Sequence, residues 1–131
     1  MPTVSPQPSI SLAPTVYNCA SPGGRNSDIN SIVTEISGTP ILGSPEYQAY
    51  DWILNTDNTF GCGSGIISLR QRFILAIFYY ITNGDTWSRH DNWLQPDIPE
   101  CSWYGVICDS DGLVTRLELG QFIAFLFSHL I

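Results

Sequence analysis

The sequence predicts a small α+β domain that is mainly helical and follows a disordered N-terminal arm. Three observations support this. Apolar residues recur at helical spacing in residues 44–55 and 68–84, residues 113–119 form a strand-like run with leucines two apart at its end, and residues 1–43 show no sustained period. With 131 residues, the chain has room for one domain. We therefore expect two helices, loops rich in aromatic residues and one short hairpin.

The arm, residues 1–43, is rich in Ser, Thr, Pro, Gly and Asn and holds six of the nine prolines. Such a composition is typical of a linker or disordered segment, because it cannot bury enough apolar surface to offset the loss of chain entropy. Within it, only INSIVTEI has the composition of a short, transient strand.

The first predicted helix starts the folded domain, residues 44–120. Ser44 is a good N-cap and Pro45 suits the first helical position. Tyr47, Tyr50 and Leu54 then recur on one face, and the glycine-rich segment NTDNTFGCGSG ends the helix.

The second predicted helix is apolar around most of its circumference and should form the core. Ser68 can cap its start, and Asn83-Gly84 is a strong stop signal, with Gly84 able to adopt the left-handed conformation. The buried stripe is expected to contain Leu69, Phe73, Ile74, Ala76, Ile77, Phe78, Tyr80 and Ile81.

An irregular aromatic and acidic segment follows, because Pro96 and Pro99 exclude a helix. Trp87 and Trp93 should anchor this segment on the second helix. Its acids, and those of the turn after Cys108, lack the alternating spacing of a calcium loop, so we expect a solvated acidic face. These acids are Asp85, Asp91, Asp97, Glu100, Asp109 and Asp111.

The hairpin prediction comes from a turn signal followed by a strand-like run. Residues 109–112 form an acidic turn ending in Asp-Gly. In LVTRLEL, Val114, Leu117 and Leu119 should face inward, while Arg116 and Glu118 face outward.

The four cysteines are Cys19, Cys62, Cys101 and Cys108. An even number in a small chain favours disulfides, although four cysteines allow three connectivities. A zinc site is the alternative, but it would need four ligands and favours pairs separated by two residues.

Charge and motifs exclude several classes of function. The chain has five arginines, no lysine and a net charge of −7, whereas nucleic acid and anionic lipid need clustered cations. His90 stands between Arg89 and Asp91, but neither Ser88 nor Ser102 lies in a nucleophile motif. We therefore expect no enzyme activity, cofactor, metal site or membrane span in this chain.

Three segments together resemble a known family: LAIFYYITNGDTW, then NWL, then CSWYGVICDSDGLVTRLEL. They look like the plant-type N-terminal cap of leucine-rich-repeat proteins, in the form common in diatoms and other microalgae. SPEYQAYDWI resembles the additional upstream helix of the algal caps. The resemblance covers residues 44–120.

The resemblance implies a role for several residues. Cys101 and Cys108 would form a disulfide, whereas Cys19 and Cys62, a possible second pair, have no clear counterpart in the family. Residues expected to pack the cap are Trp87, Trp93, Trp103 and Gly105, although the tryptophans and Tyr104 could instead form a ligand face. Val114, Leu117 and Leu119 match the spacing of the first repeat, and Arg116 and Glu118 would belong to its partner-facing surface.

The sequence departs from the family after Leu119. Residues 121–131 form an apolar tail without the asparagine and leucines of a repeat, so we expect a cap from a truncated leucine-rich-repeat protein. The resemblance implies a non-enzymatic, receptor-like module that recognises protein or peptide partners in an extracellular or membrane-attached parent protein. The alternative is a small secreted protein that binds a ligand with its loop aromatics.

Overall fold

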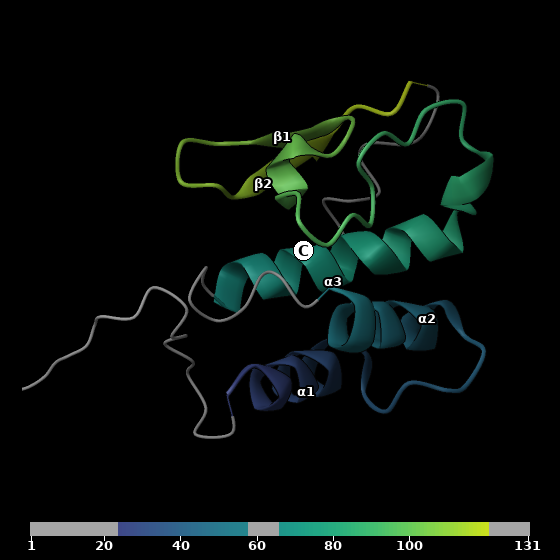
Figure 1. Cartoon of the computed structure of the whole chain (residues 1–131), viewed down its shortest axis with the longest axis vertical. Helices are drawn as coiled ribbons and strands as arrows, with labels where there is room; N and C mark the ends of the chain where they lie inside the picture. The colour runs from purple at the N-terminus through teal and green to yellow at the C-terminus, as the bar shows by residue number, and fades with distance from the viewer. Residues whose placement is uncertain (1–23, 58–65, 121–131) are drawn as a thin grey trace, which may run out of the picture.

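The computed structural model describes residues 24–57 and 66–120 (Figure 1). Its fold is α+β and mainly helical, as the sequence predicts, but the described residues contain three α-helices where we expected two. The helices are α1 (Arg25–Ser37), α2 (Pro45–Asp51) and α3 (Ile66–Ile81), and the strands are β1 (Val106–Cys108) and β2 (Val114–Leu117). A π-helix, η2 (Trp52–Thr56), extends α2, and two 3-10 turns are η4 (Gly84–Thr86) and η5 (Glu100–Ser102).

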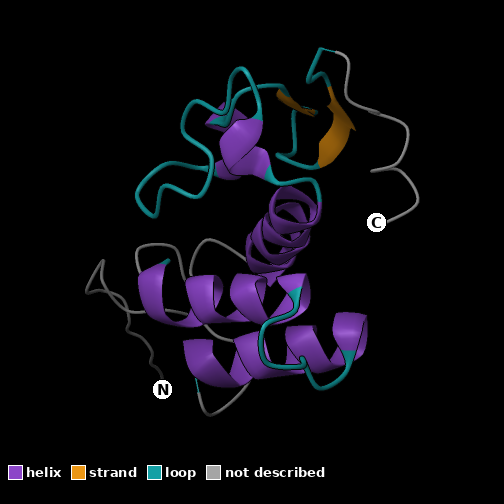
Figure 2. Ribbon diagram, turned by 90° about the vertical axis from the view of Figure 1, so that its right-hand side faces the viewer, coloured by secondary structure: helices purple, strands orange, loops and turns teal. Residues whose placement is uncertain are grey.

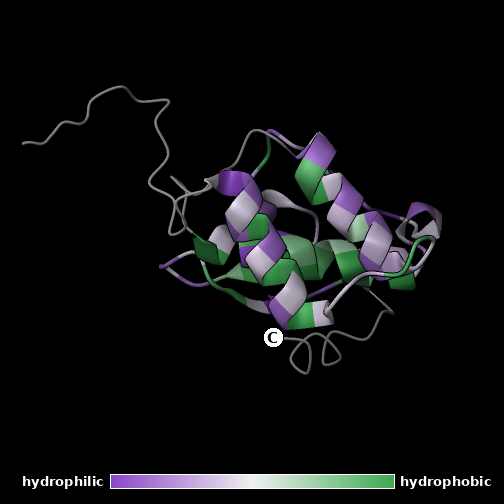
Figure 3. Ribbon diagram, turned by 90° about the horizontal axis from the view of Figure 1, so that it is seen from below, coloured by the Kyte–Doolittle hydropathy of each residue, from purple (hydrophilic) through white to green (hydrophobic). Residues whose placement is uncertain are grey.

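Helix α3 lies between two layers. Figure 1 and Figure 2 show α1 and α2 side by side against one side of α3, with the hairpin and the loop before it on the other side. The core therefore surrounds α3. Figure 3, seen from below, shows hydrophobic residues concentrated behind the two helices nearest the viewer, where α3 runs.

The sequence of α3 accounts for this central position. Its residues from Gln71 to Tyr79 are all buried, so the helix contacts neighbours around its whole circumference. The predicted stripe is confirmed except at its end, where Tyr80 is half-buried and Ile81 is exposed.

The prediction of disorder is wrong for residues 24–43, because α1 occupies most of them. INSIVTEI, predicted as a strand, is helical. Ile29, Ile32 and Val33 lie on one face at helical spacing and are buried. Packing against α3 and η2 thus overrides a composition that favours loops, and the folded unit begins near Arg25 rather than Ser44.

Helix α2 begins as predicted. The backbone N–H of Tyr47 donates to the Ser44 hydroxyl, with 3.1 Å between nitrogen and oxygen, and Pro45 takes the first helical position. The helix continues into η2, which buries Trp52 and Ile53. A helical segment over residues 45–56 matches the prediction closely.

Both ends of α3 differ from the prediction in detail. The helix begins at Ile66, and the Ser68 hydroxyl donates to the Glu100 carboxylate instead of capping the helix. Past the C-terminal end, Asn83 rather than Gly84 is left-handed, with φ of 56°. Gly84 is required for a different reason: a Cβ there would lie 2.2 Å from the Tyr79 ring.

Strands β1 and β2 pair antiparallel through the turn predicted at residues 109–112. The pairing aligns Val106 with Leu117, and its register shifts between Ile107 and Cys108. Because of this irregularity, Val114 and Leu117 both face inward although they are three residues apart. Leu119 is buried as well, so the predicted inward set is confirmed.

Some predictions lie outside the described residues: the arm before residue 24, the apolar tail of residues 121–131, and a pairing of Cys19 with Cys62. Among the helices that the structure describes, none has the length and apolar character needed to cross a membrane.

Candidate functional site

The outer face of β2 carries Arg116, and Glu118 follows it; these are the two residues that the family resemblance predicts to face a partner. Thr115, Arg116 and Glu118 are exposed, and the carboxylate of Glu118 lies 2.7 Å from the Arg116 guanidinium. Within residues 24–57 and 66–120, β1 is the only strand that pairs with β2. The second edge of β2 therefore has no partner strand in the described part of the chain.

A disulfide fixes this hairpin near its turn, where β1 ends. As predicted, Cys101 in η5 and Cys108 in β1 are joined, with Cα atoms 5.7 Å apart. Between them Gly105 has φ of 80°, and a Cβ there would lie 2.4 Å from the Glu118 carbonyl oxygen. Glycine is thus required for the backbone hydrogen bond from Glu118 N–H to the Gly105 carbonyl (2.7 Å).

The three loop tryptophans pack inside the domain, whereas Tyr104, the fourth residue of the alternative ligand face, is partly exposed. Trp87, Trp93 and Trp103 are each at most 6% exposed. The Trp93 ring stacks on Tyr79 at 5.7 Å and contacts Trp103 at 5.2 Å, and its indole N–H donates to the Tyr104 carbonyl at 2.8 Å. This confirms the predicted packing role.

Tyr79 connects this aromatic cluster to the turn after α3. Its hydroxyl donates to the Asp85 carboxylate at 2.5 Å. Burial, and secondly this hydrogen bond, raises the pKa of Tyr79 above its ordinary value. Burial also raises the pKa of Tyr80.

A buried ion network occupies the other half of α3. The Arg72 guanidinium donates two hydrogen bonds of 2.7 Å to the Asp57 carboxylate, and both side chains are fully buried. Arg72 also lies 3.3 Å from the Glu100 carboxylate. Arg25 adds a second cation, 3.8 Å from the Asp57 carboxylate, and donates to the Asp57 backbone carbonyl.

Aromatic rings and backbone carbonyls complete the surroundings of Arg72. Its guanidinium carbon lies 5.4 Å from the Trp52 ring centre and 5.0 Å from that of Trp103. The N–H groups of the Arg72 guanidinium donate hydrogen bonds to the carbonyl oxygens of Ile98 (2.9 Å) and Gln95 (3.2 Å). The network thus joins η2, α3 and the loop before η5.

The electrostatics of the network reflect its burial. Desolvation raises the pKa of the Asp57 carboxyl, and hydrogen bonding to Arg72 offsets part of the rise. Glu100 is buried too, which corrects its predicted place on a solvated acidic face. The other five acids of that group, from Asp85 to Asp111, are exposed.

Sequence analysis missed this network, although one signal was available. Arg72 falls three residues after Leu69 and four before Ala76, which places it on the buried stripe of α3. A charged residue on such a stripe requires a buried partner. Nothing in the sequence identifies Asp57 and Glu100 as those partners, because they lie 15 and 28 residues away.

The residues weighed for catalysis do not form a recognisable unit. His90 is exposed and its ring lies 6.1 Å from that of Tyr79. Ser88 and Ser102 are exposed as well. In the described part of the chain, no three His, Cys, Asp or Glu side chains form a group suited to a metal ion.

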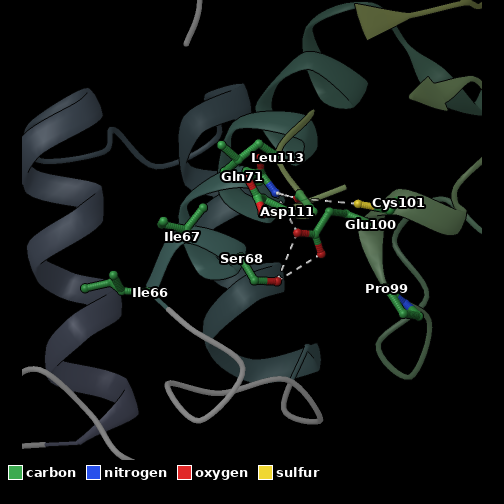
Figure 4. A pocket seen from close by; sticks show the side chains of 10 residues that line it. Ile66, Ile67, Ser68, Gln71, Pro99, Glu100, Cys101, Asp111 and Leu113 are labelled. Atoms are coloured by element: carbon green, nitrogen blue, oxygen red, sulfur yellow. Dashed lines mark hydrogen bonds between the residues drawn. The ribbon is translucent and has the colours of Figure 1, made fainter. Parts of the chain in front are cut away.

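One hollow of about 560 Å³ lies between the start of α3, η5 and the hairpin turn (Figure 4). Its walls include Ile67, Pro99, Cys101 and Leu113, and Glu100 lies in its floor. It opens on a different part of the surface from the outward side chains of β2, since none of these lines it.

Comparisons with known proteins give no information on the family or function of this chain. No protein-family model, no curated protein and no solved structure matches it.

Proposed function

We propose that this chain is the N-terminal cap of a leucine-rich-repeat protein and acts as a non-enzymatic interaction module. The observation that carries the proposal is the arrangement of β2. The inward residues Val114 and Leu117 of β2 are buried, as is Leu119 just after it. The outward residues Thr115 and Arg116 are exposed, and one edge of β2 pairs with β1. A first repeat strand needs these properties, because the next strand must add to its other edge.

The layers around α3 support a capping role. The end of a repeat array exposes an apolar surface, which a terminal unit must cover with a fold of its own. Here α1, α2 and α3 contribute most of the buried core residues, and the disulfide joins η5, which contacts α3, to β1 of the hairpin. In this proposal, further repeats follow β2 in the parent protein.

The parent protein would recognise a protein or peptide through the surface that begins with Arg116 and Glu118. A disulfide is compatible with an extracellular or membrane-attached location, because such links persist in oxidising compartments. The alternative, ligand binding by the loop tryptophans, is weakened by their burial.

A fusion experiment tests the capping role. Residues 1–120 are joined directly to a consensus leucine-rich-repeat array from which its own N-terminal cap has been removed. In a matched control, a flexible Gly/Ser linker separates the two parts, so that β2 cannot stack on the first strand of the array.

The direct fusion should unfold in one cooperative transition at a higher urea concentration than the linker control. Urea denaturation followed by circular dichroism measures this difference. Equal midpoints for the direct fusion and the linker control would contradict the capping proposal.

A further inference from the structure

Exposed apolar side chains gather at the hollow between α3, η5 and the hairpin turn. Six large hydrophobic side chains of the described residues are exposed, and three of them line it: Ile66 (39%), Ile67 (53%) and Leu113 (38%). Figure 4 shows Ile66 and Ile67 on the α3 side of the hollow, with Pro99 and Cys101 on the opposite side. A volume of about 560 Å³ is within the range of ligand pockets.

The polar groups in the floor of the hollow are satisfied within the protein. The Gln71 amide donates to Glu100 (2.8 Å) and to the Gly112 carbonyl (3.1 Å), and its oxygen accepts from Val114 N–H (2.7 Å). Glu100 also accepts from Ser68 and Arg72. The floor therefore offers little to a polar ligand, and the apolar walls favour an apolar one.

The acidic rim of the hollow favours a ligand that carries a positive charge next to its apolar group. Asp111 lines the hollow and is exposed, and the exposed Asp109 lies on the same turn. The residues that line the hollow include no basic side chain, and the whole chain carries a net charge of −7. A cation is attracted to this rim, and an anion is repelled.

We propose that the hollow binds a peptide segment of a partner protein in which an apolar residue lies next to arginine or lysine. The apolar side chain enters between Ile67 and Leu113, and the cation pairs with Asp111. This inference goes beyond the capping function and does not depend on it, because the outer face of β2 does not line the hollow.

Fluorescence anisotropy with the full chain tests the proposal. The probe is a fluorescein-labelled peptide of alternating leucine and arginine. One comparator replaces arginine by glutamate, and the other replaces leucine by serine. Each comparator should bind at least about tenfold more weakly, and binding of the probe should weaken as salt is added. No binding of the leucine–arginine peptide, or equal binding of the serine–arginine peptide, would overturn the proposal.

Matched variants locate the binding. Ile67→Ser should weaken binding about tenfold and Asp111→Asn about threefold, because one contact and one charge are lost. Leu42→Ser, which alters a residue that is 80% exposed and does not line the hollow, should have no effect. Circular dichroism checks that all three variants fold.

If the variants Ile67→Ser and Leu42→Ser bind the probe peptide with equal affinity, binding in the hollow is refuted. Sedimentation equilibrium of the unlabelled chain examines the other possible occupant, a second copy. A dimer that Ile67→Ser converts to monomer would also overturn the peptide proposal.

Discussion

The two halves of α3 are held by different forces. Around Arg72, near the start, charges are buried and each is compensated by ion pairs, carbonyls and two indole rings. Around Phe78 and Tyr79, near the end, aromatic rings pack against Trp87 and Trp93. Truncating an aromatic side chain lowers the free energy of unfolding in proportion to the apolar surface removed. Removing one partner of a buried ion pair lowers it more, because the remaining charge stays buried without compensation. The first half should therefore respond to substitution more sharply than the second.

The largest effect is expected at Arg72. Arg72→Ala leaves the Asp57 and Glu100 carboxylates buried without their common cation, so the free energy of unfolding should fall by about 3–5 kcal/mol. Urea denaturation monitored by tryptophan fluorescence measures it. The control is Arg70→Ala, which removes an arginine from the same helix whose partner, Glu35, is exposed. Similar losses in both variants would contradict a special role for the buried network.

Gly84→Ala should have the next largest effect, in the aromatic half. The new methyl group would lie 2.2 Å from Cδ2 of Tyr79, so the ring must move, at a cost of about 1–3 kcal/mol. Thermal denaturation gives the value. Tyr79→Ala removes the ring that the methyl group meets, and in that background Gly84→Ala should cost less. An equal cost in both backgrounds would show that the Tyr79 ring is not the obstacle.

A smaller effect is expected from Trp93→Phe. The benzene ring retains part of the packing but loses the N–H donor to the Tyr104 carbonyl, so the loss should be about 1–2 kcal/mol. Trp87→Phe is the comparison, because the Trp87 N–H donates over a longer distance, 3.3 Å, to the Thr82 carbonyl. The prediction fails if Trp87→Phe costs more than Trp93→Phe.

The smallest effect concerns high pH. Burial and the bond to Asp85 raise the pKa of Tyr79, so the folded state resists ionisation that the unfolded chain undergoes near pH ~10. Stability from this source is complete below pH ~10 and is lost as the pH rises above it. Ultraviolet absorbance of tyrosinate should show a late ionisation step that is absent in Tyr79→Phe. If the titration curves of the unsubstituted protein and Tyr79→Phe differ only near pH ~10, where ordinary tyrosines ionise, the raised pKa of Tyr79 is contradicted.

The hairpin was predictable because its signals are local. Asp-Gly marks the turn, and Leu117 and Leu119, two residues apart, mark the buried face. The irregularity that brings Val114 to the same face has no such local signal. Helix α1 was not predicted, because it lacks a side-chain cap and is rich in residues that favour loops. It is stabilised by contacts of Ile29 and Ile32 with the rest of the core, which sequence composition does not reveal.

Part of the candidate site was predictable from local sequence signals, and part was not. The disulfide and the outward residues of β2 come from a contiguous segment with fixed spacing. The hollow lies between Ile67 in α3 and Leu113 in the turn, and this juxtaposition depends on how distant elements dock. Sequence pattern specifies which faces are apolar, but not which of them remain uncovered.

Arg72 also bears on which partly folded states this domain can adopt. Asp57 precedes α3 and Glu100 follows it, so the guanidinium obtains its full set of partners only when both flanking segments are docked. In an intermediate with one segment detached, a charge of the network would be exposed or would stay buried without its partner. The free energy of this intermediate would then be higher than that of the native chain or of the unfolded chain. We therefore expect the two layers on either side of α3 to open together, as a single cooperative unit.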